Sequence, residues 1–213
     1  DAAGNVVDQY LCMIPMTEVS IEDTWYTVGM RGTASNCIVA NDVFIPNHRL
    51  FSLFSALQGV YPREEVSEAL YRSTFAAFFP MNLTGPLVGL GRAALRHVIK
   101  MAPNRGITGT IYKKQTDSSV FQVQIAEAAM KIDAAELLVT RAADDIDSAA
   151  SRGEMMPLPA RTRARASAAY AGSQITDAIN ILMSAHGAGS FAASNPLQRI
   201  WRDANIATRH TAL

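Results

Sequence analysis

Apolar residues recur at three- and four-residue steps through most of this sequence, from about Glu64 onward. The clearest run consists of Phe121, Ile125, Ala128, Ile132, Ala135 and Val139. Such a stripe forms the apolar side of an amphipathic helix, and polar residues occupy the positions between its members. The sequence therefore predicts a long helix over residues 117–151.

Two more helices are predicted on either side of the long one. The first runs over about residues 82–101 and is broken at Pro103–Gly106. The second carries the stripe Ala168, Gly172, Ile175, Ile179 and Leu182, whose small members let helix axes approach closely. It ends at the small-residue turn Gly187, Ala188, Gly189.

A fourth helix is predicted to run from Pro196 to the chain end. Asn195 is suited to cap it, and proline is favoured in a first helical turn. Four helices with apolar stripes predict an antiparallel four-helix bundle over residues 81–213.

Before the helices, residues 6–53 are rich in β-branched and aromatic side chains and are interrupted by turn residues. Four runs read as strands, at residues 10–15, 25–28, 37–40 and 43–46, with Pro46 closing the region. The prediction is an α+β, mainly α chain with part of an antiparallel β domain (1–55), a connecting segment (56–80) and the bundle. Strands this short need a larger sheet, so a preceding part of the protein is expected to supply the rest.

Composition narrows the classes of partner. Nineteen basic and nineteen acidic residues balance, which argues against a nucleic-acid or anionic-membrane partner. Cys12 and Cys37 are too few for a disulfide framework and have no metal-type spacing, so no metal site and a cytoplasmic location are expected. No run of about eighteen apolar residues is present. The abrupt start at Asp1 is that expected of a fragment.

Several short motifs occur in an order that resembles the acyl-CoA dehydrogenase superfamily. Its middle β domain is resembled by Asp23-Thr24-Trp25, Gly29-Met30-Arg31-Gly32-Thr33-Ala34-Ser35 and Val43-Phe44-Ile45-Pro46. Its C-terminal bundle is resembled by Arg105 with Thr108-Gly109, Gln122 with Ala126-Glu127, and Pro196-Leu197-Gln198-Arg199 with Arg202-Asp203-Ala204. Within the superfamily, these motifs are most similar to those of the oxygenase components of two-component flavin-dependent aromatic monooxygenases, such as the 4-hydroxyphenylacetate and 3-HSA hydroxylases.

The resemblance implies a function and partners. It implies an oxygenase that takes reduced flavin (FMNH2 or FADH2) from a separate NAD(P)H-dependent reductase. Such an oxygenase reacts the reduced flavin with O2 to a C4a-hydroperoxyflavin and hydroxylates a small aromatic, typically phenolic, substrate. The resemblance also implies a helical N-terminal domain that this chain lacks. Long alanine-rich helices with apolar stripes suit a homotetramer in which the bundles pack together. The sequence has no glycine-rich nicotinamide-binding turn after a strand, which agrees with reduction by another protein.

The final segment separates two reactions within the superfamily. An acyl-CoA dehydrogenase needs a carboxylate base to remove a proton from its thioester substrate. In many members this Glu lies eight residues after the Asp of the Arg-Asp-Ala motif, but the same count from Asp203 reaches Thr211 here. No acidic residue follows Asp203. An acyl-CoA dehydrogenase or oxidase with a relocated base therefore remains as an alternative, as does a non-catalytic fragment that only assembles.

His210 is the candidate catalytic residue. Its imidazole suits a hydrogen bond to a flavin hydroperoxide or the handling of a phenol proton near neutral pH. The resemblance places a histidine of the last helix against the flavin. The plainer interpretation is a histidine that complements the dipole at a helix C-terminus.

Candidate cofactor-binding residues are Arg105 and the turn His186, Gly187, Ala188 and Gly189. An arginine at a break between helices can bind phosphate through two hydrogen bonds, and small residues let a backbone approach a cofactor. The resemblance implies that both reach the flavin of a neighbouring subunit, although His186 replaces the first Gly of the dehydrogenase Gly-Gly-x-Gly pattern. A solvated arginine and a simple helix terminator are the alternatives.

Other conspicuous residues are interpreted as structural. Trp25 and Trp201 are expected in the cores of the sheet and the bundle. Arg202 and Asp203 are expected to hold the last helix. The basic run at 161–165 is interpreted as a solvated helix start. Neither His48 nor His97 has a partner at a telling spacing.

Overall fold

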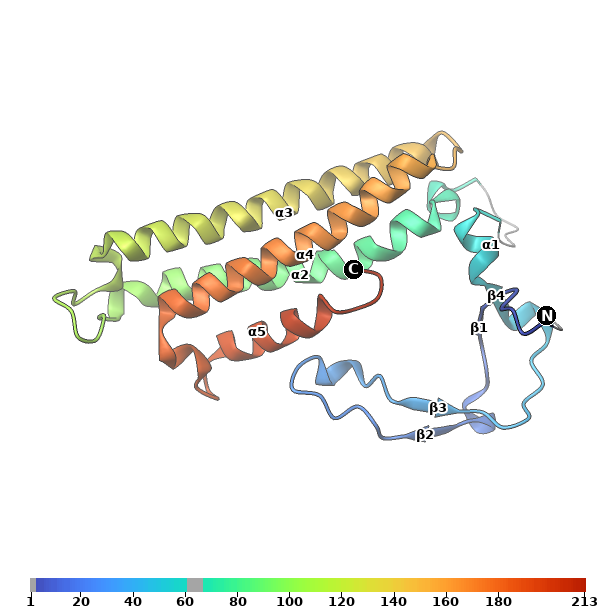
Figure 1. The fold of residues 1–213 in the computed structure, drawn as a ribbon, viewed down its shortest axis with the longest axis horizontal. Coiled ribbons are helices and arrows are strands. Elements are labelled where there is room, and N and C mark those ends of the chain that lie inside the picture. The colour runs from blue at the N-terminus through green and yellow to red at the C-terminus, as the bar shows by residue number, and fades with distance from the viewer. Residues whose placement is uncertain (1–2, 61–66) are drawn as a thin grey trace.

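The structure is a computed structural model that describes residues 3–60 and 67–213. The chain is mainly helical, with two small antiparallel sheets near its N-terminus (Figure 1). The sheets pair β1 (Tyr10–Cys12) with β4 (Leu50–Ser52) and β2 (Ser20–Glu22) with β3 (Cys37–Val39). The helices are α1 (Leu53–Leu57), α2 (Phe75–Met101), α3 (Ser119–Ser151), α4 (Leu158–His186) and α5 (Pro196–Ala207).

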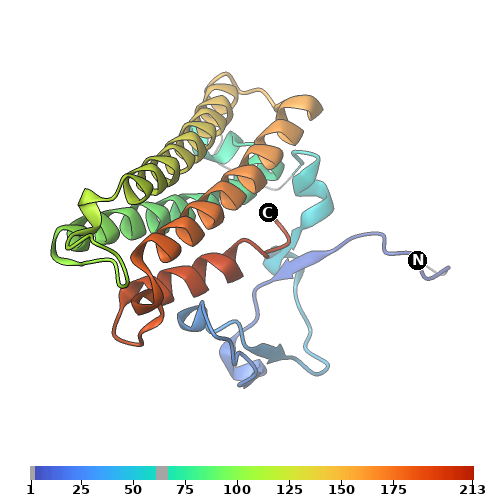
Figure 2. The ribbon, with the colours of Figure 1, turned by 60° about the vertical axis from the view of Figure 1, so that its left-hand side comes forward.

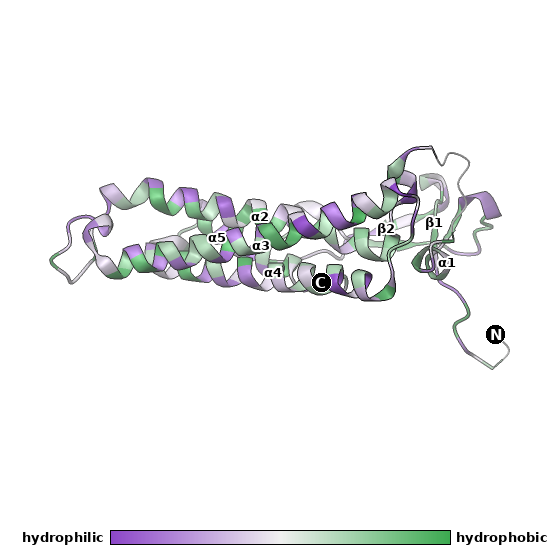
Figure 3. Ribbon diagram, turned by 90° about the horizontal axis from the view of Figure 1, so that it is seen from above, coloured by the Kyte–Doolittle hydropathy of each residue, from purple (hydrophilic) through white to green (hydrophobic). Residues whose placement is uncertain are grey.

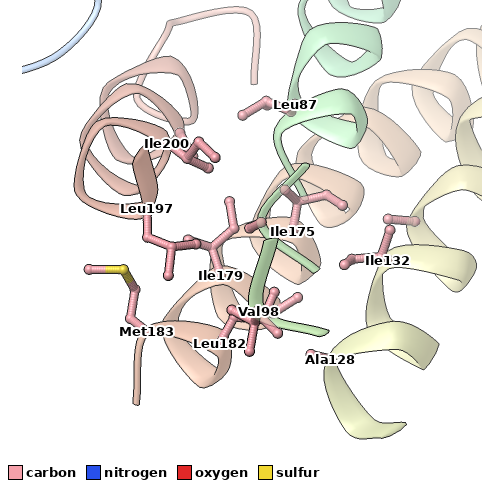
Figure 4. Packing of buried hydrophobic residues seen from close by; sticks show 14 of the residues in the cluster. Leu87, Val98, Ala128, Ile132, Ile175, Ile179, Leu182, Met183, Leu197 and Ile200 are labelled. Carbon is pink, nitrogen blue, oxygen red and sulfur yellow. The ribbon is translucent and has the colours of Figure 1, made fainter. Parts of the chain in front are cut away.

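Helices α2, α3 and α4 lie side by side along the length of the molecule, and the shorter α5 packs beside α2 and α4 (Figures 1 and 2). Their common core contains large side chains that are almost fully buried (Figure 4). Among them are Leu87, Val98, Ile132, Ile175, Ile179, Leu182 and Leu197. Apolar and polar residues alternate along each helix, as expected where one side faces a core (Figure 3).

The predicted α3 and α4 agree closely with the structure, but the predicted start of α2 at residue 82 is wrong. The helix begins at Phe75 and continues through Pro80 and Pro86. Its first turns pack in a second buried cluster, in which Ala77 meets residues of α3 and α4 such as Ile146 and Ala164. This packing outweighs the hydrogen bonds that the prolines cannot donate.

The prediction that the last helix reaches the chain end is also wrong. Helix α5 stops at Ala207, and Thr208 donates its hydroxyl to the carbonyl oxygen of Ala204. The chain then folds back, so that Ala212 is buried and Leu213 packs against the core. His210 therefore lies in a turn after the helix.

Two of the four predicted strands are wrong. Residues 25–28 do not pair, because the backbone N–H groups of Thr24 and Trp25 donate to Asn36 Oδ1 at 3.1 and 3.0 Å. Residues 43–46 are not a strand either, and Phe44 is 86% exposed. The pairing strands are β2 and β4 instead. The start of the helical region at residue 64 and the middle of the connecting segment lie outside the described residues.

No helix within residues 3–60 and 67–213 is long and apolar enough to cross a membrane. In the same part of the chain, no three His, Cys, Asp or Glu side chains gather where they could hold a metal ion. Cys12 and Cys37 are exposed and unbridged.

Candidate functional site

A cavity of about 590 Å³ lies at the end of the helical region where α4 stops. The loop after α2 contributes Arg105 and Gln115, the end of α4 contributes His186, and the turn Gly187–Gly189 completes one wall. The first turn of α3 also lines the cavity. The structure thus brings Arg105 together with residues 186–189, the predicted cofactor-binding set.

Arg105 and Gln115 hold the end of α4 in place. Arg105 Nη2 donates to the carbonyl oxygen of His186 at 3.2 Å, and Gln115 Nε2 donates to that of Ala185 at 3.0 Å. The last carbonyls of a helix lack partners within it and carry partial negative charge. The guanidinium therefore stabilises the α4 terminus while it lines the cavity.

Polar atoms around the cavity remain without partners among the described residues. They are Arg105 Nε, Gln115 Oε1 and His186 Nδ1, all buried. Gly189 lies so close to Arg105 that an added Cβ would be 3.1 Å from Nη2. The Arg105 guanidinium, the N-terminal turn of α3 and the small-residue turn Gly187–Gly189 together suit an anionic group such as a phosphate.

His186 is almost fully buried, and its neighbour Asn195 determines its tautomer. Asn195 Oδ1 accepts from Leu197 N–H at 2.9 Å, so Asn195 Nδ2 is the donor that faces His186 Nε2 at 3.0 Å. The same Nδ2 also donates to the Gly189 carbonyl. His186 Nε2 is then an acceptor, and the proton of the neutral ring is on Nδ1.

A second histidine, missed at the level of sequence, lies beside His186. The ring of His97 on α2 is 5.7 Å from that of His186. Burial, Arg105 and His97 lower the pKa of His186 from 6.5 to about 4. Burial, Lys100 and Arg105 also lower the pKa of His97. His186 is therefore neutral near pH 7, as its bond to Asn195 requires.

His210 lies elsewhere. It is exposed in the turn after α5, where its ring is 6.2 Å from that of Phe79 near the start of α2. His97, whose ring lies beside that of His186 in the cavity wall, is 18 residues further along the same helix. Because an α-helix rises about 1.5 Å per residue, the two positions are about 27 Å apart along its axis. The structure does not bring the candidate catalytic residue to the cavity.

Helix α5 is fixed between these two places by the β segment. Asp203 Oδ1 accepts from the Met30 backbone N–H at 2.6 Å, and Arg202 donates to the Val28 carbonyl. Gly29 packs so tightly that an added Cβ would lie 2.6 Å from the Arg202 backbone. Met30 has a φ of 53°, in the left-handed region that few residues other than glycine adopt. Arg202 and Asp203 thus join the last helix to the β segment.

The tryptophans and the basic run are accounted for by contacts. Trp201 packs against the core and donates to Asn180, and the half-buried Trp25 donates to the Met30 carbonyl. Of the basic run, Arg161 donates to the Leu57 carbonyl. Arg165 donates to the carbonyl of Thr211, in the His210 turn.

The family of the chain follows from comparison with known proteins. A family model described as "Acyl-CoA dehydrogenase, C-terminal domain" matches residues 82–213, which include α3, α4, α5 and most of α2. The chain belongs to the acyl-CoA dehydrogenase family. The resemblance inferred from the sequence motifs is therefore confirmed.

Curated relatives of the chain are named as oxygenases. The oxygenase subunit HsaA of a flavin-dependent monooxygenase from Rhodococcus jostii is 32% identical over 98% of the chain and 55% of its own length. The oxygenase component of an FADH(2)-dependent resorcinol hydroxylase from a Rhizobium species is 30% identical over 100% and 54%. The chain therefore spans about half the length of these relatives.

Solved structures of family members superpose on the whole chain. XiaF from a Streptomyces species, in complex with FADH2 and glycerol, has a TM-score of 0.89 and 40% identity, covering 100% of this chain and 54% of its own. The 3-HSA hydroxylase from a Rhodococcus species has a TM-score of 0.87 and 31% identity, with 99% and 54% covered.

Proposed function

We propose that the protein to which this chain belongs is the oxygenase component of a two-component flavin-dependent monooxygenase that hydroxylates a phenolic substrate with O2. The observation that carries this proposal is the chemistry of the final segment. After the Arg202–Asp203 pair, which joins α5 to the β segment, the chain provides His210 and no carboxylate base. The oxygenase names of the relatives support the same reaction.

The cofactor of this reaction is reduced flavin, which when bound reacts with O2 and supplies the oxygen atom that enters the substrate. The residues present fit such a group. Arg105 would bind its phosphate, with the Gly187–Gly189 turn and the α3 N-terminus around it. The names of XiaF's complex and of the resorcinol hydroxylase favour FADH2 over FMNH2. A separate NAD(P)H-dependent reductase would supply it.

The chain contributes to the reaction in two ways under this proposal. The cavity residues bind and orient the phosphate end of the flavin, and His210 holds a proton at the reacting end. Because these places are about 27 Å apart along α2, two subunits would share each flavin. This separation supports an oligomer in which each cavity takes the phosphate of a neighbour's flavin, and the oligomer that we propose is a homotetramer.

The same proposal assigns the parts of the chain. Residues 1–55 would be the last part of the middle β domain, 56–80 the connection, and 81–213 the antiparallel four-helix bundle of the C-terminal domain. The two unbridged cysteines favour a cytoplasmic location.

The test uses the full-length protein with photoreduced FAD, oxygenated buffer and a panel of phenols, and it measures hydroxylated product and hydrogen peroxide. We expect product without any reductase in the mixture. A protein that holds oxidised flavin tightly and loses its yellow colour on adding an acyl-CoA would instead be a dehydrogenase. Formation of neither product nor bleaching would indicate a protein that only assembles.

Arg105→Ala tests the cavity. Because it removes a charge-assisted hydrogen bond, the Kd for FADH2 should rise about 10- to 100-fold. Arg163→Ala is the matched control, since Arg163 is an exposed arginine of α4 outside the cavity. Equal affinities of the two variants would contradict the role given to Arg105.

A further inference from the structure

The turn after α5 fixes the tautomer of the neutral His210 ring. The backbone N–H of Ala212 donates to His210 Nδ1 at 3.2 Å. A backbone N–H can only donate, so Nδ1 must be the unprotonated nitrogen of the ring. The proton of the neutral imidazole is then on Nε2, and no side chain or backbone group of the described residues pairs with Nε2.

The donor in this bond is itself held in place. Ala212 is 5% exposed, Leu213 packs against the main core, and Leu213 N–H closes the turn by donating to the His210 carbonyl at 2.9 Å. Arg165 of α4 donates from Nη2 to the carbonyl of Thr211 at 3.1 Å, and Thr211 is the residue between His210 and Ala212. The exposed ring thus sits on a backbone that two helices and the core constrain.

We propose that His210 acts as a hydrogen-bond donor through Nε2–H, not as a base, and that Arg165 is a positioning residue that holds its turn. This inference rests on the proposed function. A histidine that accepted a phenol proton at Nε2 would need its own proton on Nδ1, where it would face the N–H of Ala212. Two donors would then oppose each other, and a bond of the turn would be lost.

The chain contains its own reference for this assignment. His186 is held by Asn195 in the opposite tautomer, with the proton on Nδ1. Two histidines near the two ends of α5 should therefore give opposite patterns in one spectrum of one sample.

Solid-state ¹⁵N spectra of the full-length protein, labelled at histidine, measure the tautomers without any turnover. Signals are assigned by their disappearance in His210→Asn and His186→Gln. We expect a protonated Nε2 and an unprotonated Nδ1 for His210 at pH 7.5, and the reverse for His186. A protonated Nδ1 on His210 would overturn the inference, whether or not the protein hydroxylates phenols.

Two replacements of His210 test the same point in turnover. The amide of Gln places an N–H near the position of Nε2, whereas that of Asn lies near Nδ1. We expect His210→Asn to lower the rate of coupled hydroxylation about 10²- to 10³-fold, as loss of a donor at a reacting centre does. His210→Gln should keep at least about a tenth of the wild-type rate. Equal losses in both variants would refute the donor role. A wild-type protein without hydroxylation would refute the proposed function alone, since the spectra would still report the tautomer.

Arg165→Ala tests the positioning role. Because it removes one solvent-exposed hydrogen bond, we expect the ratio of hydroxylated product to hydrogen peroxide to fall about fivefold, with unchanged FADH2 affinity and recovery in Arg165→Lys. Arg163→Ala, two residues away, should leave the ratio unchanged. A product ratio in Arg165→Ala equal to that of Arg163→Ala would overturn this part.

Discussion

A histidine lies near each end of helix α5, His186 of α4 near its start and His210 after its end, and the surroundings of the two differ. At its start, His186 is 1% exposed and is bonded through Asn195, which also caps the helix. At its end, His210 is exposed, and a single backbone N–H binds its ring. A buried imidazole stabilises the fold, whereas an exposed one with a free nitrogen is available to a ligand. The comparison explains why the two residues are given different roles.

Both ends depend on the position of α5 itself. The largest effect on the free energy of unfolding is therefore expected where the β segment contacts this helix. Gly29→Ala would place a methyl group 2.6 Å from the Arg202 backbone, which cannot yield as a side chain can. Overpacking of this kind costs about 3 kcal/mol of unfolding free energy. Urea unfolding followed by tryptophan fluorescence measures it, because Trp25 and Trp201 lie on either side of the contact.

Gly32→Ala is the matched control in the same segment, since an added Cβ there meets nothing within 4 Å. If the two alanine variants unfolded at the same urea concentration, the contact between Gly29 and α5 would not hold the helix.

The next effect distinguishes the two functions of Asn195 at the start of α5. Asn195→Ala removes the helix cap and leaves the buried His186 Nε2 without a donor, and we expect a local cost of about 2 kcal/mol. Asn195→Asp keeps a capping oxygen but loses the Nδ2 donor, so it should lose about half as much. Amide hydrogen exchange at Ser190 and Leu197 measures both. Equal exchange rates in the two variants would mean that the cap contributes nothing, and an Asn195→Asp variant that exchanged as slowly as the wild type would mean that the bond to His186 contributes nothing.

The start of α5 was predictable from sequence, and its end was not. Asn195 followed by Pro196 is a local signal, since the cap bonds to a backbone only two residues away. The end at Ala207 is marked by neither glycine nor proline. It depends on the burial of Ala212 and Leu213 against helices that are distant in sequence. The start of α2 at Phe75 was not predicted either, because it depends on the packing of Ala77 against α3 and α4, which are distant in sequence.

The candidate site was likewise predictable from sequence only in part. The sequence motifs indicated Arg105 and residues 186–189, and the structure brings them to one cavity. Their binding of flavin stays a prediction. His97 was missed because its partner His186 is far along the chain, and no spacing within α2 indicates it. Arg165 was taken as solvated, since only the fold brings it to the His210 turn.

The smallest effect is a dependence of stability on pH at the start of α5. The pKa of His186 is about 4 in the folded protein, against an ordinary value of 6.5. The unfolded chain therefore takes up a proton first as the pH falls, so the stability that neutral His186 contributes is complete above pH 6.5 and is lost progressively toward pH 4. Between pH 7 and pH 5.5 the loss is about 1 kcal/mol. Hydrogen exchange at Leu197, compared with His186→Gln at each pH, measures it, because glutamine accepts from Asn195 without titrating. The difference between the wild type and this variant should shrink as the pH falls. A difference that stayed constant from pH 7 to pH 5.5 would contradict the lowered pKa of His186.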